Sequence, residues 1–408
     1  GREGYRGRCC LMGAMIILIV FLLCVFTSVP IGFSIGLSVV AYALATGSVN
    51  MGYIASGLFA SCDSFPLMAI PFFILSGALM EGGGLSKRLA VGAIMVPTMV
   101  EKGYDKKFAM ALVAASGCLG VIIPPSIPFV LYSTSAGTSV GDMFMGGWIP
   151  GIMMGLSLVI IIMIECRKKG IQASKAKSSW GQRWKSFREA FWGFLMPVII
   201  IGGIYGGVFT PTEAAAVSVV YGLVVGVFIY REGKMKDMID ILVDSGKTTG
   251  GIMLIIGAAT LFSYVCTVFG IAQAAQALLL EISGNKYIFL LIVNVIFLIA
   301  GCFVDANSAM YIFIPIMYPV ATQLGIDPVH FGVIATVNLA IGQVTPPVGV
   351  NLFVAIGVSE KLQGLRDKTK VTIVSMSKAV WPQIVACIIA LLLITYVPWF
   401  STVLLFGK

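Results

Sequence analysis

Long apolar runs alternate with short polar or basic segments along most of the chain. Many of these runs approach the length of about 20 residues that an α-helix needs to cross the hydrocarbon core of a bilayer. They lie at 11–29, 31–46, 66–79, 108–132, 145–164, 191–209, 214–230, 251–269, 287–303, 311–324 and 381–397. The pattern therefore predicts an all-α polytopic membrane protein.

One apolar run contains a proline pair, Pro346–Pro347, where a membrane helix is otherwise expected. Two prolines remove two backbone donors and clash with the preceding turn, so the helix must break there. Gly342 and Gly349 lower the cost of an irregular backbone on either side. Freed carbonyls at bilayer depth are tolerated where they are buried in protein or line a polar cavity. The stretch is either an ion or solute site, with Thr345 and Asn351 beside it, or a plain proline kink.

The same pattern occurs a second time, at Pro124–Pro125, and this repetition favours a site. The first prolines of the two pairs are 222 residues apart, and a glycine precedes each pair by four residues, at Gly120 and Gly342. The same offset relates Asp105 to Asp327. It also relates Met95 to Met317, Pro97 to Pro319, and Gly103 to Gly325. The chain is therefore predicted to be a duplicated membrane unit.

The two copies differ in the charge of equivalent loops. The loop around Gly103 carries Lys102, Lys106 and Lys107, whereas its counterpart at 323–331 has no lysine or arginine. Basic loops lie on the cytoplasmic side of a membrane, so the second loop is expected outside. Equivalent loops on opposite faces indicate an inverted-topology repeat, the architecture of secondary transporters.

A polar segment, Asp305–Ser308, separates the apolar arms 287–303 and 311–324. Neither arm leaves room for an independent crossing and a loop, so the pattern predicts a re-entrant hairpin with this segment at its tip. An acid between apolar segments is costly unless it is paired or holds a cation. Asp305 is therefore a candidate ligand.

The first copy is about 36 residues shorter than the second between equivalent positions. The shortfall lies near 89–92 and corresponds to the first arm and polar tip of the hairpin. The chain carries a genuine internal deletion, or the sequence omits a segment; the residues alone do not distinguish these.

Two further polar segments, 210–213 and 167–190, each have a structural interpretation and an alternative. Thr210, Pro211 and Glu213 suit a capping box at a helix start, with an intramembrane functional acid as the alternative. The basic segment 167–190 suits an amphipathic helix on the cytoplasmic surface, with a flexible linker as the alternative. The predicted organisation is a polar extension at 1–10, a first repeat at 11–166, the linker at 167–190, scaffold helices and a connecting arm at 191–250, and a second repeat at 251–408 with a hairpin at 287–324 and a broken helix at 328–358.

Composition supports this class and excludes others. The chain is 58% hydrophobic and 11% charged, which is far from a soluble domain. Its formal charge of +9 comes from basic loops and does not indicate nucleic acid binding. Nine scattered cysteines and one histidine, His330, give no transition-metal pattern, and His330 is expected at a surface or interface. No catalytic motif of a hydrolase or protease is present, so an enzyme is not expected.

Three motifs in order make the chain resemble the large membrane subunit of TRAP transporters, the DctM type. They are the runs 114–128, 210–216 and 342–353, and the resemblance extends from about Met12 to Phe406. It departs at the short first hairpin and at residues 1–10.

The resemblance implies a sodium-driven elevator importer in the bacterial inner membrane. It implies two partners, a small four-helix membrane subunit and a periplasmic binding protein that delivers an organic acid such as a dicarboxylate or sialic acid. The implied sodium ligands are Gly120, Ser126, Asp305, Asn307, Ser308, Gly342 and Thr345. The implied substrate contacts are Pro124, Pro125, Pro346, Pro347, Gly349 and Asn351, with backbone amides at half-helix starts as the anion anchor.

Two rival functions remain at this point. One is a stand-alone anion carrier of a related inverted-repeat fold, which needs no binding protein. The other is a transport-impaired paralogue that binds the small subunit but lacks sodium-dependent uptake because of the internal deletion.

Overall fold

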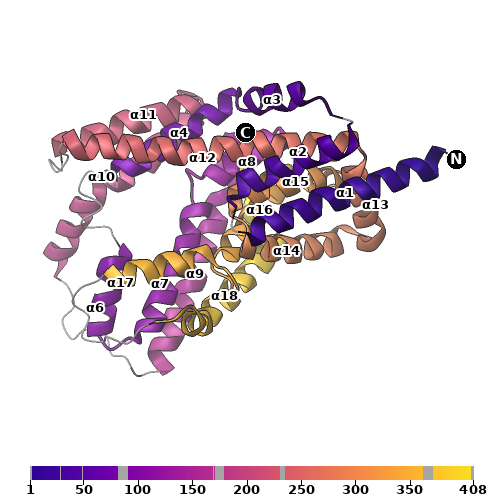
Figure 1. Ribbon diagram of the computed structural model, residues 1–408. Coiled ribbons are helices and arrows are strands. Elements are labelled where there is room, and N and C mark those ends of the chain that lie inside the picture. Colours follow the sequence, from indigo (N-terminus) through magenta and orange to yellow (C-terminus); the bar gives the residue numbers. More distant parts are fainter. Residues whose placement is uncertain are drawn as a thin grey trace.

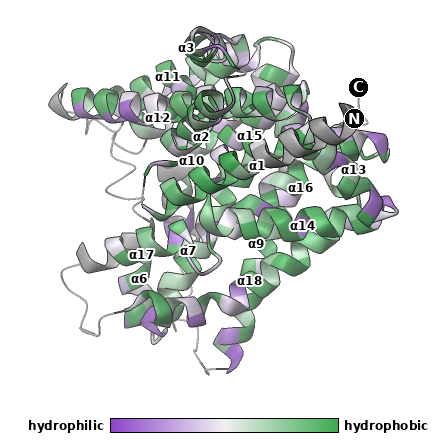
Figure 2. Cartoon of the chain, turned by 45° about the vertical axis from the view of Figure 1, so that its right-hand side comes forward, coloured by the Kyte–Doolittle hydropathy of each residue, from purple (hydrophilic) through white to green (hydrophobic). Residues whose placement is uncertain are grey.

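The computed structural model describes residues 2–27, 29–47, 49–80, 91–168, 170, 179–229, 235–361 and 371–405. Every regular element in these ranges is a helix (Figure 1). Five of the described helices are long and apolar enough to cross a membrane, or seven if each of two bent helix pairs forms one span. Most helices are hydrophobic along their length (Figure 2). The predicted all-α polytopic membrane fold is confirmed.

The first half of the chain, to Lys168, consists mainly of helices separated by short breaks. Its elements are α1 (Arg2–Phe26), α2 (Ile31–Thr46), α3 (Met51–Ala60), η1 (Phe65–Met68), α4 (Ala69–Met80), α6 (Val91–Glu101), α7 (Lys106–Ile122), α8 (Ile127–Ala136) and α9 (Val140–Lys168). Helix α1 begins at Arg2, so the segment predicted as a polar extension is helical. Residues 81–90, which include part of the predicted junction near 89–92, lie outside the described residues.

The second half begins with a helix that follows the basic linker. Its elements are α10 (Trp180–Tyr205), α11 (Pro211–Val224), η3 (Val225–Ile229), α12 (Met235–Val268), α13 (Ile271–Ser283), α14 (Lys286–Phe303), α15 (Ala306–Gln323), α16 (Pro328–Gly342), α17 (Val350–Lys361), α18 (Ile373–Tyr396), α19 (Trp399–Thr402) and η4 (Val403–Leu405). Of the linker, residues 169 and 171–178 lie outside the described part of the chain.

Both predicted helix breaks are present. Helices α7 and α8 are bent by 42° around the first proline pair, and α16 and α17 are separated by residues 343–349 around the second. The Pro124–Pro125 and Pro346–Pro347 peptide bonds are both cis. The two breaks differ in length, with residues 123–126 between α7 and α8 and residues 343–349 between α16 and α17.

The helices also confirm the duplication. Asp105 caps the start of α7 and Asp327 caps the start of α16, each through its side chain. Helices α6 and α15 end at equivalent positions, Glu101 and Gln323. Where α7 crosses α16, the Cys118 thiol donates to the Ala340 carbonyl at 2.8 Å, a contact between residues 222 apart in sequence. Equivalent residues that touch each other lie on a pseudo-two-fold axis between the copies.

Helix α16 lies at the centre of the packing. Every residue from Val329 to Gly342 is buried, and α7, α9, α14, α15 and α18 all pack against it. A separate group formed by α2, α4, α11 and α12 runs along another side of the molecule (Figure 1). A helix that is buried on all sides is mostly apolar around its circumference. The buried polar side chains of α16, His330, Thr336 and Asn338, each have a hydrogen-bonding contact inside the bundle.

Local sequence rules explain several helix starts. The predicted capping box is confirmed: Thr210 accepts from the Glu213 amide, and Glu213 accepts from the Thr210 amide at 2.8 Å. Of the predicted amphipathic segment 167–190, residues 180–190 belong to α10, which continues into the next apolar run without a break, with Trp180 and Trp184 exposed. His330, in contrast, is buried rather than at a surface, because its Nε2 contacts the Thr395 carbonyl at 3.1 Å inside the bundle.

Candidate functional site

A cavity of about 350 Å³ lies where the first helix break meets the tip of the predicted hairpin. It brings together the end of α7, the starts of α8 and α15, the residue that follows α16, and parts of α4 and α10. Its lining residues are Phe73, Ser76, Gly77, Gly120, Val121, Pro125, Ile127, Pro128, Met196, Ala306, Asn307 and Gln343. Segments from both repeats thus share one cavity, and three of the predicted site residues, Gly120, Pro125 and Asn307, line it.

Asp305 sits between the two arms of the hairpin, α14 and α15, and caps α15. Its carboxylate accepts hydrogen bonds from the backbone N–H of Asn307 at 3.0 Å, the backbone N–H of Ser308 at 3.1 Å and the Ser308 hydroxyl at 2.5 Å. An aspartate is a favourable helix N-cap because its oxygens satisfy the first amides of the helix. The carboxylate therefore has partners in the first turn of α15, which explains in part how an acid is retained between apolar arms.

The first arm of the hairpin approaches the second broken helix very closely. A Cβ added to Gly342 of α16 would lie 2.5 Å from the Gly301 Cα of α14. Only glycine allows backbones to approach this closely. The last turns of α14 and α16 are thus in contact, and each presents the negative end of a helix dipole. Two such ends beside the Asp305 carboxylate form an environment that favours a cation.

Asn307 is the predicted residue with the clearest unmet bonding capacity. Its Oδ1 is buried and has no hydrogen-bond partner among the described residues, and its side chain lines the cavity. A buried polar atom without a partner carries a desolvation cost of about 1–3 kcal/mol. The Asn307 oxygen is therefore available to a cation or to a donor group of a solute.

The hydroxyls predicted as ligands have partners close in sequence. The Ser126 hydroxyl donates to the Val121 carbonyl at 2.5 Å, and the Thr345 hydroxyl donates to the Ile341 carbonyl at 2.9 Å. Both bonds bridge a helix end, where carbonyls lack their usual partners. A hydroxyl oxygen that donates one bond can still accept or bind a cation.

Several predicted substrate residues do not line this cavity. Of the second proline pair neither member reaches it, nor do Gly349 and Asn351. The Asn351 side chain lies instead beside α7, where its nitrogen is 3.2 Å from the place of a Cβ on Gly117. Gln343, which sequence reasoning missed, lines the cavity because it directly follows the last turn of α16. Its position next to Gly342 in the break motif was the available signal.

The described lining has no Lys, Arg, Asp or Glu side chain. Electrostatics there come from helix ends: α8 and α15 begin at the cavity, and α7 and α16 end at it. A helix start favours an anion and a helix end favours a cation. The arrangement can therefore hold an anion and a cation near each other.

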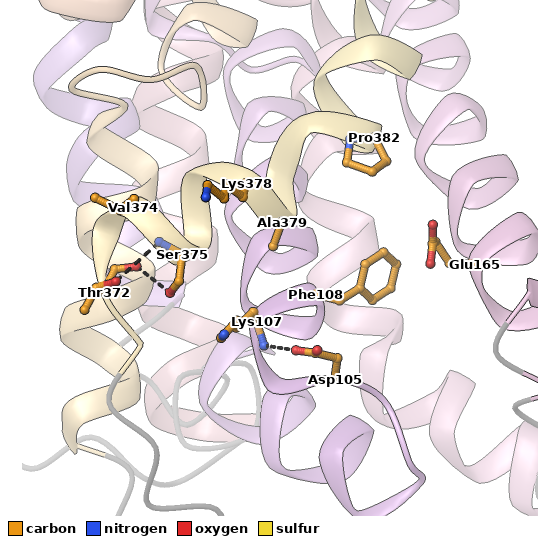
Figure 3. A pocket seen from close by; sticks show the side chains of 10 residues that line it. All are labelled: Asp105, Lys107, Phe108, Glu165, Thr372, Val374, Ser375, Lys378, Ala379 and Pro382. Carbon is orange, nitrogen blue, oxygen red and sulfur yellow. Dashed lines mark hydrogen bonds between the residues drawn. The ribbon is translucent and has the colours of Figure 1, made fainter.

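A second cavity, of about 560 Å³, lies at the opposite end of α7 (Figure 3). It is lined by charged side chains, among them Lys107, Glu165 and Lys378. Its distance from the helix break is about 20 Å, because 14 residues of α7 separate Phe108 from Ile122 at 1.5 Å each. It includes the two caps formed by Asp105 and Thr372. This cavity is separate from the candidate site.

Comparison with known families places the chain. The sequence profile of the DctM component of tripartite ATP-independent periplasmic transporters matches residues 18–90 and 89–400. The chain belongs to this DctM family. The function of the family is transport, so the chain is a transporter component of the membrane. The profile matches in two segments that meet at 89–90, where the first repeat is short.

DctM relatives cover almost the whole chain. The C4-dicarboxylate TRAP transporter large permease protein DctM of Rhodobacter capsulatus is 36% identical over 445 residues, which cover 96% of this chain and 99% of that protein. The isethionate TRAP transporter permease protein DctMQ of Oleidesulfovibrio alaskensis is 39% identical over 93% of this chain, which spans 64% of that longer protein. The Alcanivorax borkumensis YdaH transporter shares the fold, with a TM-score of 0.50, 14% identity and 98% coverage of each chain.

Proposed function

We propose that the chain is the large membrane subunit of a transporter that couples import of an organic acid anion to sodium across the bacterial inner membrane. The observation that carries this proposal is the cavity at which a broken helix of one repeat meets the hairpin tip of the other. In secondary transporters, discontinuous helices place backbone dipoles beside the substrate and the coupling ion. We include in this proposal an elevator mechanism, in which the binding site moves across the membrane together with the helices that form it.

The hairpin tip is the proposed sodium site. Asp305 provides the charge, Asn307 a buried oxygen without a partner among the described residues, and Ser308 a hydroxyl beside the carboxylate. Gly342 and Thr345 belong to the helix end and break that pack against the hairpin. Hard cations prefer oxygen ligands of these kinds. Gly120 and Ser126 from the first repeat remain predicted ligands.

The anion is proposed to bind at the start of α8, which borders the cavity and carries the equivalent of about half a positive charge. The first backbone amides of α15 already donate to the Asp305 carboxylate. Pro124, Pro125, Pro346, Pro347, Gly349 and Asn351 remain the predicted contacts in the two breaks. The substrate class stays an organic acid, such as a C4-dicarboxylate or sialic acid, because relatives of this family include a C4-dicarboxylate permease.

Two protein partners complete the proposal: a small four-helix membrane subunit and a periplasmic solute-binding protein. Apolar side chains of α1 and α2, including Phe26, Phe33 and Leu44, are exposed. Such surfaces on a membrane protein are covered by lipid or by another membrane subunit. The rival functions are a stand-alone anion carrier and a transport-impaired paralogue. Transport assays on the reconstituted chain, with and without its partners, distinguish them from this proposal.

The test is uptake of a labelled C4-dicarboxylate into proteoliposomes that contain the chain with its small subunit and binding protein. We expect uptake to require an inward sodium gradient and to fall by about tenfold or more in Asp305→Asn, because interactions with a charged group contribute about 1.5–3 kcal/mol. Asparagine is also a good N-cap, so the variant should fold.

The same assay distinguishes the alternatives. Uptake without the binding protein supports the stand-alone carrier, and copurification with the small subunit but no uptake supports the impaired paralogue. Uptake that needs sodium equally in wild type and Asp305→Asn would remove Asp305 from the site.

A further inference from the structure

The two copies of the repeated unit have unequal surroundings at equivalent positions. On α16, Asn338, Leu339 and Gly342 are buried. Their equivalents on α7, which are Ser116, Gly117 and Gly120, are exposed. The duplication therefore has one covered broken helix and one that is partly uncovered.

The glycines ahead of the proline pairs show the difference most directly. A Cβ on Gly342 would meet the Gly301 backbone of α14 at 2.5 and 2.6 Å. A Cβ on Gly120 would meet nothing within 4 Å in the described part of the chain. Gly120 faces the cavity, whereas Gly342 faces a hairpin arm.

Chain length explains this asymmetry. Helix α14 alone has 18 residues, whereas only residues 81–90 connect Met80 to Val91. A segment this short cannot contain both a counterpart of α14 and a polar tip. The R. capsulatus alignment extends over 445 residues, more than the 408 of this chain, and the family profile divides at 89–90. Family members thus contain residues for which this chain has no counterpart.

The missing arm changes the electrostatics of the first copy. At the second break, the ends of α14 and α16 are in contact, and Asp305 follows the end of α14 by two residues. A helix end and a carboxylate each favour a cation. At the first break, α7 supplies a single helix end, and no acidic side chain is among the described lining residues. A local hydroxyl bond is common to both breaks, since the Val121 carbonyl accepts from Ser126 and the Ile341 carbonyl accepts from Thr345, so the difference lies in the helix ends and the acid. A cation stripped of water needs several oxygen ligands at once.

We infer that the chain binds its coupling cation once, at the hairpin tip of the second repeat, and that the first repeat has no matching cation site. This inference rests on the proposed sodium coupling and limits it to one ion in a duplicated scaffold. Gly120 then borders an open cavity, and neither Gly120 nor Ser126 acts as a sodium ligand.

The number of bound ions is obtained from the way in which sodium concentration changes the stability of the folded chain. The purified full chain is unfolded by heat in lipid nanodiscs at increasing sodium chloride, with choline chloride keeping the ionic strength constant. Each ion that binds only the folded state adds a stabilisation that grows with the logarithm of its concentration. The free energy of unfolding is plotted against the natural logarithm of the sodium concentration. At sodium concentrations well above the dissociation constant, the slope of this plot in units of RT approaches the number of ions bound.

We expect a slope of about one for the wild type and about zero for Asp305→Asn. Asparagine retains the N-cap, and its amide can donate to the Ser308 hydroxyl, so the variant removes the charge without removing the helix start. A wild-type slope of about two would overturn the single-site inference and leave sodium coupling intact. A wild-type slope of about zero would overturn sodium coupling itself, and an unchanged slope in Asp305→Asn would place the ion elsewhere.

Discussion

Gly120 and Gly342 show how equivalent residues acquire different roles. Each precedes a proline pair by four residues and lies in the last turn of a broken helix. Gly342 permits the closest helix contact at the site, that between α14 and α16, whereas Gly120 borders a cavity. The same residue type is thus required by packing in one copy and by nothing in the described part of the other.

Substitution of both glycines by alanine tests this difference. Gly342→Ala should destabilise the protein by about 1–3 kcal/mol, because the added methyl group overlaps the Gly301 backbone. Gly120→Ala should be neutral or stabilising by up to about 1 kcal/mol, because alanine is the better helix former. Thermal unfolding of the two variants under identical conditions measures both effects. Equal destabilisation would mean that Gly120 is also packed.

At the scale of elements, a buried polar cluster connects α14, α16 and α18. The side-chain Nδ2 of Asn338 donates to the side-chain Oδ1 of Asn294 at 2.7 Å and to the backbone carbonyl of Ile334 at 2.8 Å. Asn294 donates to the Thr395 hydroxyl at 3.2 Å. All three side chains are buried. Because such bonds have no competing water, they fix the register of the hairpin arm against the broken helix.

Asn338→Leu should therefore destabilise the chain by about 1–3 kcal/mol, since Asn294 loses its short-range partner inside the bundle. The double variant Asn294→Leu/Asn338→Leu should cost less than the sum of the single variants, because it removes both partners together. Ser116→Ala, at the equivalent position of α7, is the control and should stay within about 0.5 kcal/mol. Additive costs in the double variant would contradict a direct coupling of the two asparagines.

At the scale of the whole molecule, the duplication raises the question of orientation. The charge of equivalent loops predicts that the repeats are inverted across the membrane. Equivalent positions of the two copies meet at the Cys118–Ala340 contact, as expected near a pseudo-two-fold axis. Glu101 and Gln323 are equivalent, exposed ends of α6 and α15.

Single cysteines at these two positions test the inversion. In a background without native cysteines, we expect Glu101→Cys to react with a membrane-impermeant maleimide from the cytoplasmic side. Gln323→Cys should react only from the outer side. Labelling of intact cells against inverted vesicles gives the side for each. Reaction of both cysteines from the same side would show parallel repeats and would overturn the predicted topology.

The amino-acid sequence alone was enough to predict the class of fold, the duplication, the two helix breaks and the capping box at Thr210. These features depend on chemistry between close neighbours in the chain: apolar length sets a membrane helix, proline removes a donor, and threonine three residues before glutamate caps a helix. The resemblance carried by the break motifs identified the family, which the profile match confirms.

The packing of the helices was needed to show which of these features lie together. In the structure, Gly120, Asn307 and Gln343 line one cavity. Asn351 lies beside α7 instead, and His330 is buried. The structure also showed that Gly342 is covered by α14 while Gly120 is open. Such contacts join residues far apart in sequence, and their geometry depends on how whole helices pack. Local patterns do not contain that information, which is why the candidate site was found only in part.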